Sequence, residues 1–203
     1  MKTQIKICGI TTRDDAQMAQ QYGADFIGII VAVAGTPRSV TAATAAAIRA
    51  GVSVPVVILV EKPAAHILDA LAHIRPAGVQ LIGDYADEDI RMIKRTAGCA
   101  VWKSVHLPPG GGTETTAGEI PTAIERCADA GIDVVVLDTR IKNKKGGTGI
   151  TCDWQLARTL VARSRLPVFL AGGITPHNIG AALAQVRPCG IDVSSGVEQR
   201  PGE

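Results

Sequence analysis

One aspartate and the segment that follows it in the sequence indicate where this chain could carry out chemistry. Asp138 follows the apolar, β-branched run 134–137, which is typical of a strand buried on both faces in a parallel sheet. In barrels of strands and helices the chemistry lies at the carboxyl ends of such strands. The segment 139–149 is rich in lysine and glycine, so its backbone N–H groups suit an anion such as phosphate. The alternative is an ordinary loop in which Asp138 only caps the next helix.

A unit of strand, loop and helix repeats along the chain and must position these residues. Strands are expected at residues 5–8, 26–31, 56–60, 79–81, 100–105, 134–138, 168–170 and 190–193. Helices are expected between them at about residues 16–22, 41–50, 64–74, 87–96, 121–130, 153–163 and 176–186. The stretch 107–118 holds adjacent prolines and consecutive glycines, so a long flexible loop is expected there.

This alternation predicts the fold class. Eight strands and their helices, at a mean repeat of about 25 residues, favour an α/β fold that closes into an eight-stranded parallel β/α (TIM) barrel. Residues 1–203 are expected to form this single domain, because no low-complexity linker divides them. An open doubly wound sheet is the alternative. The sequence ends a few residues after the eighth strand, so the closing C-terminal helix should be short or absent.

The composition limits the class of protein. Lysine and arginine number 21 against 19 acidic residues, a net charge of only +2, so no nucleic-acid surface is expected. Aromatic residues make up 3%, which indicates an aliphatic core. The five cysteines form no C-x-x-C pair, which argues against a disulfide framework or zinc knuckle and favours a cytoplasmic location. No membrane partner is expected, because no apolar run approaches the roughly 20 residues of a membrane span.

In a barrel, the residues that follow the strands share one rim. The turns after the seventh and eighth strands are rich in glycine and serine, and phosphate sites in barrels commonly lie there. Together with the loop after Asp138, they predict a phosphorylated small-molecule ligand. The residues expected to bind its phosphate are Gly147, Gly149, Gly172, Gly173, Ser195 and Gly196.

Short motifs run through nearly the whole chain in a recognisable order. They are KICGIT at 6–11, GAD at 23–25 with Gly28, PR at 37–38, LD at 137–138, GGTG at 146–149 before DW at 153–154, LAGGI at 170–174 with Pro176 and Asn178, and the segment 192–198 with PG at 201–202. This series resembles the phosphoribosylanthranilate isomerase family of tryptophan biosynthesis.

The resemblance implies an isomerase that needs no cofactor or metal. Its reaction is the Amadori rearrangement of N-(5′-phosphoribosyl)anthranilate to 1-(o-carboxyphenylamino)-1-deoxyribulose 5-phosphate, with Cys8 as general base and Asp138 as general acid. Such a pair suits the chemistry, because an acid must protonate the furanose ring oxygen and a base must remove the C2′ proton. Residues after the first and sixth strands would face each other across the barrel mouth. The oligomeric state, monomer or homodimer, is left open.

Each assigned side chain has a simpler alternative. Cys8 could be a packing residue, as buried free cysteines usually are. The resemblance places the anthranilate carboxylate at Arg38, whose guanidinium suits carboxylates, although Arg38 could also be a solvated loop charge. It also places the ribose hydroxyls at Asp192, which could instead cap the last turn. The other cysteines are expected to pack, and no histidine is given a role.

The sequence also departs from the family pattern at the substrate end. Ile82 stands where the family usually has a histidine, and the loop 31–36 is small and apolar where the family tends to have an aromatic residue and a lysine. Two alternatives therefore stay open. One is a paralogue that isomerises another aminoribose phosphate, and the other is a sugar-phosphate-binding barrel without catalytic activity.

Overall fold

The computed structural model describes residues 2–61, 63–107, 114–139 and 153–203. Its strands are β1 (Gln4–Cys8), β2 (Phe26–Val31), β3 (Ser39–Val40), β4 (Val56–Val60), β5 (Gly78–Leu81), β6 (Ala100–Leu107), β7 (Val134–Thr139), β8 (Val168–Leu170) and β9 (Gly190–Val193). Its helices are α1 (Arg13–Gln21), α2 (Ala42–Ala50), α3 (Ala64–Ile74), α4 (Asp87–Ala97), α5 (Glu114–Ala130), α6 (Trp154–Arg163) and α7 (Ile179–Val186). The predicted phosphate ligands Gly147 and Gly149 lie outside these ranges.

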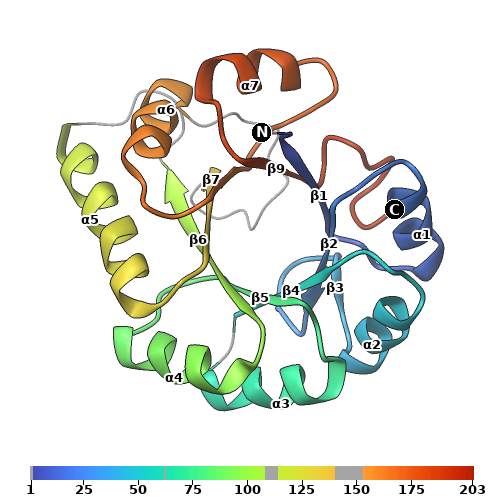
Figure 1. Cartoon of the computed structure of the whole chain (residues 1–203). Coiled ribbons are helices and arrows are strands. Elements are labelled where there is room, and N and C mark those ends of the chain that lie inside the picture. Colours follow the sequence, from blue (N-terminus) through green and yellow to red (C-terminus); the bar gives the residue numbers. More distant parts are fainter. Residues whose placement is uncertain (1, 62, 108–113, 140–152) are drawn as a thin grey trace.

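The strands close into a barrel surrounded by helices (Figure 1). All pairings are parallel in the order β1-β9-β8-β7-β6-β5-β4-β2, and β1 also pairs with β2. The two-residue strand β3 is attached to β2 alone and was not predicted from the sequence. The predicted TIM barrel is therefore confirmed, and the open sheet is excluded.

Alternate residues of each strand face two different cores. Isoleucines and valines at one set of positions pack against the helices, as Ile27 and Ile29 of β2 do. The other set points into the barrel, where Phe26, Trp102 and Phe169 form a cluster with ring centroids 4.8–5.9 Å apart. Because Phe26 begins its strand, these rings fill the amino-terminal half of the barrel. Polar chemistry is left to the carboxyl-terminal half.

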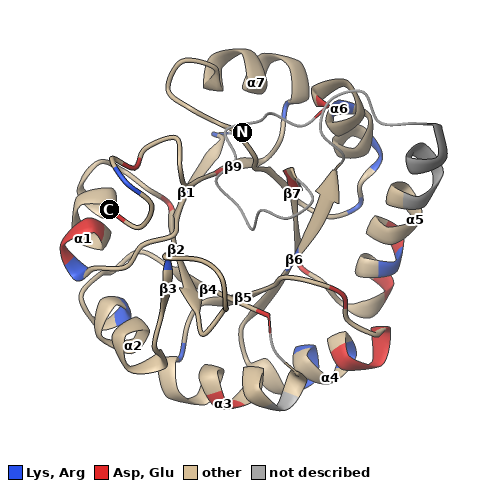
Figure 2. Ribbon diagram, turned by 180° about the vertical axis from the view of Figure 1, so that it is seen from behind, with Lys and Arg blue, Asp and Glu red and all other residues tan. Residues whose placement is uncertain are grey.

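Many charged residues lie on the outer helices, above all on α4, as Figure 2 shows. Helix α4 has acidic residues in its first turn and Lys94 and Arg95 in its last turn, an order that matches the helix dipole. Helices α1 and α2 begin at threonine caps, Thr12 and Thr41, whose side chains accept hydrogen bonds from backbone N–H groups in the first turn. None of the described helices is long and apolar enough to cross a membrane.

The predicted loop at 107–118 was wrong where the structure describes it. Leu107 ends β6, and α5 already begins at Glu114 and continues through Pro121. A proline removes one backbone donor, but tertiary packing often outweighs such local preferences. Here Ile120, Ile124 and Cys127 recur at helical spacing and are buried against the barrel.

The closing helix is absent from the described residues that follow β9. Residues 194–203 form turns and bends that fold back across the start of the chain. Thr11 donates a hydrogen bond through Oγ1 to the carbonyl oxygen of Gly202 at 2.6 Å. This segment therefore reaches the loop after β1, beside the barrel mouth.

Candidate active site

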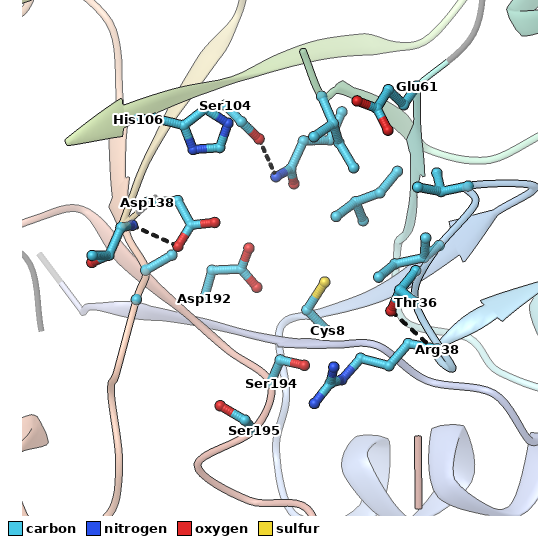
Figure 3. Close-up of a pocket in the computed structure, with 18 of the residues that line it drawn as sticks. Cys8, Thr36, Arg38, Glu61, Ser104, His106, Asp138, Asp192, Ser194 and Ser195 are labelled. Carbon is cyan, nitrogen blue, oxygen red and sulfur yellow. Dashed lines mark hydrogen bonds between the residues drawn. The ribbon is translucent and has the colours of Figure 1, made fainter. Parts of the chain in front are cut away.

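A pocket at the carboxyl ends of the strands brings together most of the predicted site residues (Figure 3). The predicted residues in its lining are Cys8, Arg38, Asp138, Gly172, Gly173, Asp192 and Ser195. Gly196 is not part of that lining. A Cβ atom at Gly196 would lie 2.0 Å from the carbonyl oxygen of Ile174, so this glycine allows the loops after β8 and β9 to approach closely.

Cys8 and Asp138 enter the pocket from different sides of the barrel, as Figure 3 shows. Cys8 ends β1, and Asp138 is the penultimate residue of β7, three strands away around the sheet. Space beside Cys8 depends on Gly28 of β2. A Cβ atom there would lie 2.8 Å from Cys8 Sγ and 3.0 Å from Lys6 Cε. The motif glycine thus leaves room for two side chains of β1.

Burial raises the pKa of Asp138, which favours its role as an acid. Removal from water raises the pKa of Asp138 to about 6, and the neighbouring charge of Asp192 adds to the rise. The backbone N–H of Thr139, which donates to Asp138 Oδ1 at 2.8 Å, acts in the opposite direction. A carboxyl group with this pKa keeps its proton to a higher pH than an ordinary aspartate does, which suits a general acid.

Cys8 is held as a neutral thiol in the free protein. Burial raises the pKa of Cys8 to about 12, Asp192 raises it further, and Lys6 opposes the rise. A thiol must lose its proton before it can act as a base. A positively charged group of a bound ligand would favour that loss, because an opposite charge nearby stabilises the thiolate.

A polar network below the pocket was not predicted. The ammonium of Lys6 donates to Asp192 Oδ2 at 2.7 Å and to Gln80 Oε1 at 3.0 Å. Gln80 in turn donates through Nε2 to Ser104 Oγ at 2.9 Å. One signal could have revealed Lys6: it lies two residues before Cys8, so both side chains point to the same face of β1.

Arg38 lines the pocket but is already bound to a carboxylate. Its Nε atom donates to Glu198 Oε1 at 2.7 Å, and its Nη2 atom donates to Glu198 Oε2. Glu198 Oε1 also accepts from the backbone N–H of Gly202 at 3.3 Å. A carboxylate in the pocket would therefore have to approach Arg38 through the edge that Glu198 leaves open.

The turn after β8 is built from glycines and fixed by an asparagine. Gly172 and Gly173 have φ angles of +82° and +65°, which residues other than glycine rarely adopt. A Cβ atom at Gly172 would lie 2.2 Å from Thr139 Oγ1. Asn178 accepts from the backbone N–H of Thr175 and donates to the carbonyl oxygen of Gly173, both at 2.8 Å. The turn thus presents backbone to the pocket just before α7.

One part of the pocket lining is apolar and consists of Ile30, Val33, Leu59 and Ile82. The polar residues Glu61 and His106 also belong to the lining. The residue that departs from the family pattern, Ile82, therefore belongs to the pocket wall. His106 was given no role from the sequence, and the structure places it in the lining next to Asp138 in the β6–β7 register.

Comparison with known proteins supports one family. The family model described as N-(5′phosphoribosyl)anthranilate (PRA) isomerase matches residues 5–203. The N-(5′-phosphoribosyl)anthranilate isomerase of Halobacterium salinarum is 40% identical over 208 residues, which cover 99% of this chain and 89% of the relative.

Solved structures agree with this family. A monomeric form of the dimeric isomerase from Thermotoga maritima superposes with a TM-score of 0.80 at 30% identity, over 100% of this chain and 92% of the other. Another isomerase structure, in complex with reduced 1-(o-carboxyphenylamino)-1-deoxyribulose 5-phosphate, gives a TM-score of 0.81 at 28% identity over the same shares.

Proposed function

The chain belongs to the N-(5′-phosphoribosyl)anthranilate isomerase family, and we propose that it converts N-(5′-phosphoribosyl)anthranilate to 1-(o-carboxyphenylamino)-1-deoxyribulose 5-phosphate in tryptophan biosynthesis. The observation that carries this proposal is one pocket in which a partly buried acid, Asp138, and a buried thiol, Cys8, occupy different sides. The family match favours this substrate over the other aminoribose phosphates and over a barrel without catalytic activity.

We infer that two residues of the pocket transfer the protons that lead from the closed sugar to the enolamine. Asp138 donates its proton to the ring oxygen as the bond from that oxygen to C1′ breaks, which leaves an iminium ion. The Cys8 thiol loses its proton to water, which the positive charge of the iminium favours, and the thiolate then removes the C2′ proton and gives an enolamine. Uptake of a proton at C1′ and loss of the enol proton yield the ketone, so the reaction is balanced without a cofactor.

The remaining pocket residues are proposed to hold the two ends of the substrate. Backbone groups at Gly172 and Gly173, with Ser195, would bind the phosphate, because the turn after β8 leads into a helix. The open edge of Arg38 would bind the anthranilate carboxylate, and Asp192 would accept hydrogen bonds from ribose hydroxyls. Gly147 and Gly149 stay proposed phosphate ligands. Gly196 is proposed to act through loop packing, since it lies outside the pocket lining.

The cytoplasm is the proposed location, because the described cysteines Cys8, Cys99, Cys127 and Cys189 are free thiols. The proposed partner is one small phosphorylated substrate. The related isomerase of Thermotoga maritima is dimeric and has been turned into monomers, and either state is proposed for this chain.

The test is the loss of phosphoribosylanthranilate fluorescence when the purified full chain is added. Wild-type protein should consume the substrate and form the ribulose phosphate product. Growth of a tryptophan auxotroph that lacks this step should also be restored. A folded protein that gives neither result would contradict the proposed function.

A further inference from the structure

Lys6 is the most completely buried charged residue of the described chain. It has no exposed surface, and it lies inside a barrel whose amino-terminal half is filled by apolar rings and aliphatic side chains. Its ammonium lies 2.7 Å from Asp192 Oδ2, and the two residues are paired across β1 and β9. Gln80 supplies a second acceptor from the opposite part of the barrel. The position of the ammonium is therefore fixed from two directions.

The two carboxylate oxygens of Asp192 differ in their hydrogen bonding. Asp192 Oδ1 is buried and has no hydrogen-bond partner among the described residues, although Asp192 lines the pocket. A buried carboxylate oxygen that lacks a donor costs free energy unless a ligand supplies one. A sugar hydroxyl in the pocket would be such a donor. The ion pair with Lys6 thus engages one oxygen and leaves the second available.

We propose that Lys6 is a positioning residue that acts through Asp192: it keeps this carboxylate ionised and oriented so that Oδ1 accepts a hydroxyl of the substrate. This assignment rests on the proposed isomerase function. Lys6 itself does not line the pocket, so it is not a catalytic residue.

Stability alone is a poor explanation for this pair. The attraction within a buried ion pair often fails to offset the free energy lost when both charges leave water. Proteins with apolar residues of similar volume in place of the pair are often as stable or more stable. The barrel interior already uses such residues in Val57, Trp102 and Phe169. A retained lysine and aspartate at this depth are better explained by what the carboxylate does in the pocket.

The electrostatic balance supports the assignment. Burial lowers the pKa of Lys6, but Asp192 and Cys8 outweigh this effect, and the pKa is raised. Burial also raises the pKa of Asp192, and Lys6 limits that rise. Without the ammonium, Asp192 would take up a proton and lose its value as an acceptor. The other titratable or charged residues that face the same space are Cys8, Arg38, Glu61, His106 and Asp138.

A double-mutant cycle tests whether Lys6 acts through Asp192. The variants are Lys6→Met, Asp192→Asn and both together, assayed for kcat/KM against pH in the full chain. We expect Lys6→Met to lower kcat/KM by about tenfold or more, the loss expected when a polar contact worth about 1.4 kcal/mol is removed. The loss should be partly reversed at higher pH, where Asp192 ionises again. In the Asp192→Asn background, Lys6→Met should cost nothing further.

The ionisation of Asp192 can be measured without substrate, so the role of Lys6 can be tested independently of the proposed isomerase function. Carbon-13 NMR of the Asp192 carboxyl group should show an ionised group at neutral pH in the wild type and a protonated one in Lys6→Met. If the wild type does not turn over phosphoribosylanthranilate, the proposed function fails while the NMR result still judges whether Lys6 controls the ionisation.

The control is Lys94→Met, which removes a lysine that lies 2.6 Å from Asp133 at a partly exposed site away from the pocket. It should leave the pH profile unchanged. The proposal is overturned if Asp192 stays ionised in Lys6→Met, or if the two substitutions have additive effects on kcat/KM. If Lys6→Met does not fold, the neutral double variant is compared with Asp192→Asn, and a lower activity of the double variant overturns the proposal.

Discussion

Arg38 and Glu198 are 160 positions apart in the sequence and are joined by two hydrogen bonds at the barrel mouth. The pair connects the loop after β2 with the segment after β9. Both side chains are almost fully buried, so solvent does little to weaken the interaction. Arg38 therefore reaches the pocket in a fixed orientation.

The first prediction concerns this orientation. Glu198→Gln keeps the shape of the side chain but removes its charge, so the guanidinium should be held less firmly. We expect KM for phosphoribosylanthranilate to rise by about tenfold, because a hydrogen bond to a charged group contributes about 1.5–3 kcal/mol. The turnover number should change much less.

The control for that experiment is Glu203→Gln in the same C-terminal segment. Glu203 pairs with Arg200, but both side chains are exposed, and such pairs contribute little. Equal effects of the two substitutions on KM would contradict a role for Glu198 in holding Arg38.

The second prediction is a gain in stability at the cost of activity. The pKa of Asp138 is raised in the folded state, so its stabilising effect is present at low pH and is lost as pH rises through about 6. Asp138→Asn removes the cost of ionisation and retains the acceptor for the Thr139 N–H group. At about pH 8 the variant should be more stable than the wild type by up to about 3 kcal/mol. Urea unfolding gives this difference, which should shrink toward about pH 4. A difference that does not depend on pH would count against the raised pKa.

The third prediction concerns the thiol of Cys8. Because its pKa is raised to about 12, iodoacetamide should label Cys8 much more slowly than the half-buried Cys99 at neutral pH. Mass spectrometry of peptides after timed labelling measures both rates in one sample. Rapid labelling of Cys8 near neutral pH would show that its thiolate is already formed in the free protein.

The fourth prediction concerns the departure at Ile82. Ile82 lies on the pocket wall and is only half buried, so a histidine there could remain in contact with water or substrate. Ile82→His should therefore preserve or raise isomerase activity, with a change in stability below about 1 kcal/mol. A clear loss of both activity and melting temperature would instead indicate a pocket remodelled around an apolar residue.

The barrel was predictable because its signals are local. Buried β-branched runs and the capping residues between them repeat along the chain, and the strands at 168–170 and 190–193 match the structure at both ends. The two-residue strand β3 was not predicted because a segment this short, paired to β2 alone, has no periodic pattern, and the start of α5 at Glu114 was missed because prolines and glycines precede it.

The polar partnerships of the site were harder to predict. Cys8, Asp138 and Asp192 could be placed at the rim because each ends or nearly ends a strand. The pairing of Lys6 with Asp192 and of Arg38 with Glu198 joins residues 186 and 160 positions apart. The sequence offers no local signal for such contacts, since they form only when the barrel closes.

The central claim is that Cys8 and Asp138 transfer protons to and from one sugar. Its most direct test is the turnover number of Cys8→Ala and Asp138→Asn on phosphoribosylanthranilate, followed by the loss of substrate fluorescence. Each substitution should lower turnover by about 10²–10⁴-fold with little change in substrate binding, because general acid–base groups contribute about that much. A folded Cys8→Ala protein that turns over the substrate at the wild-type rate would contradict the role of Cys8 as the base.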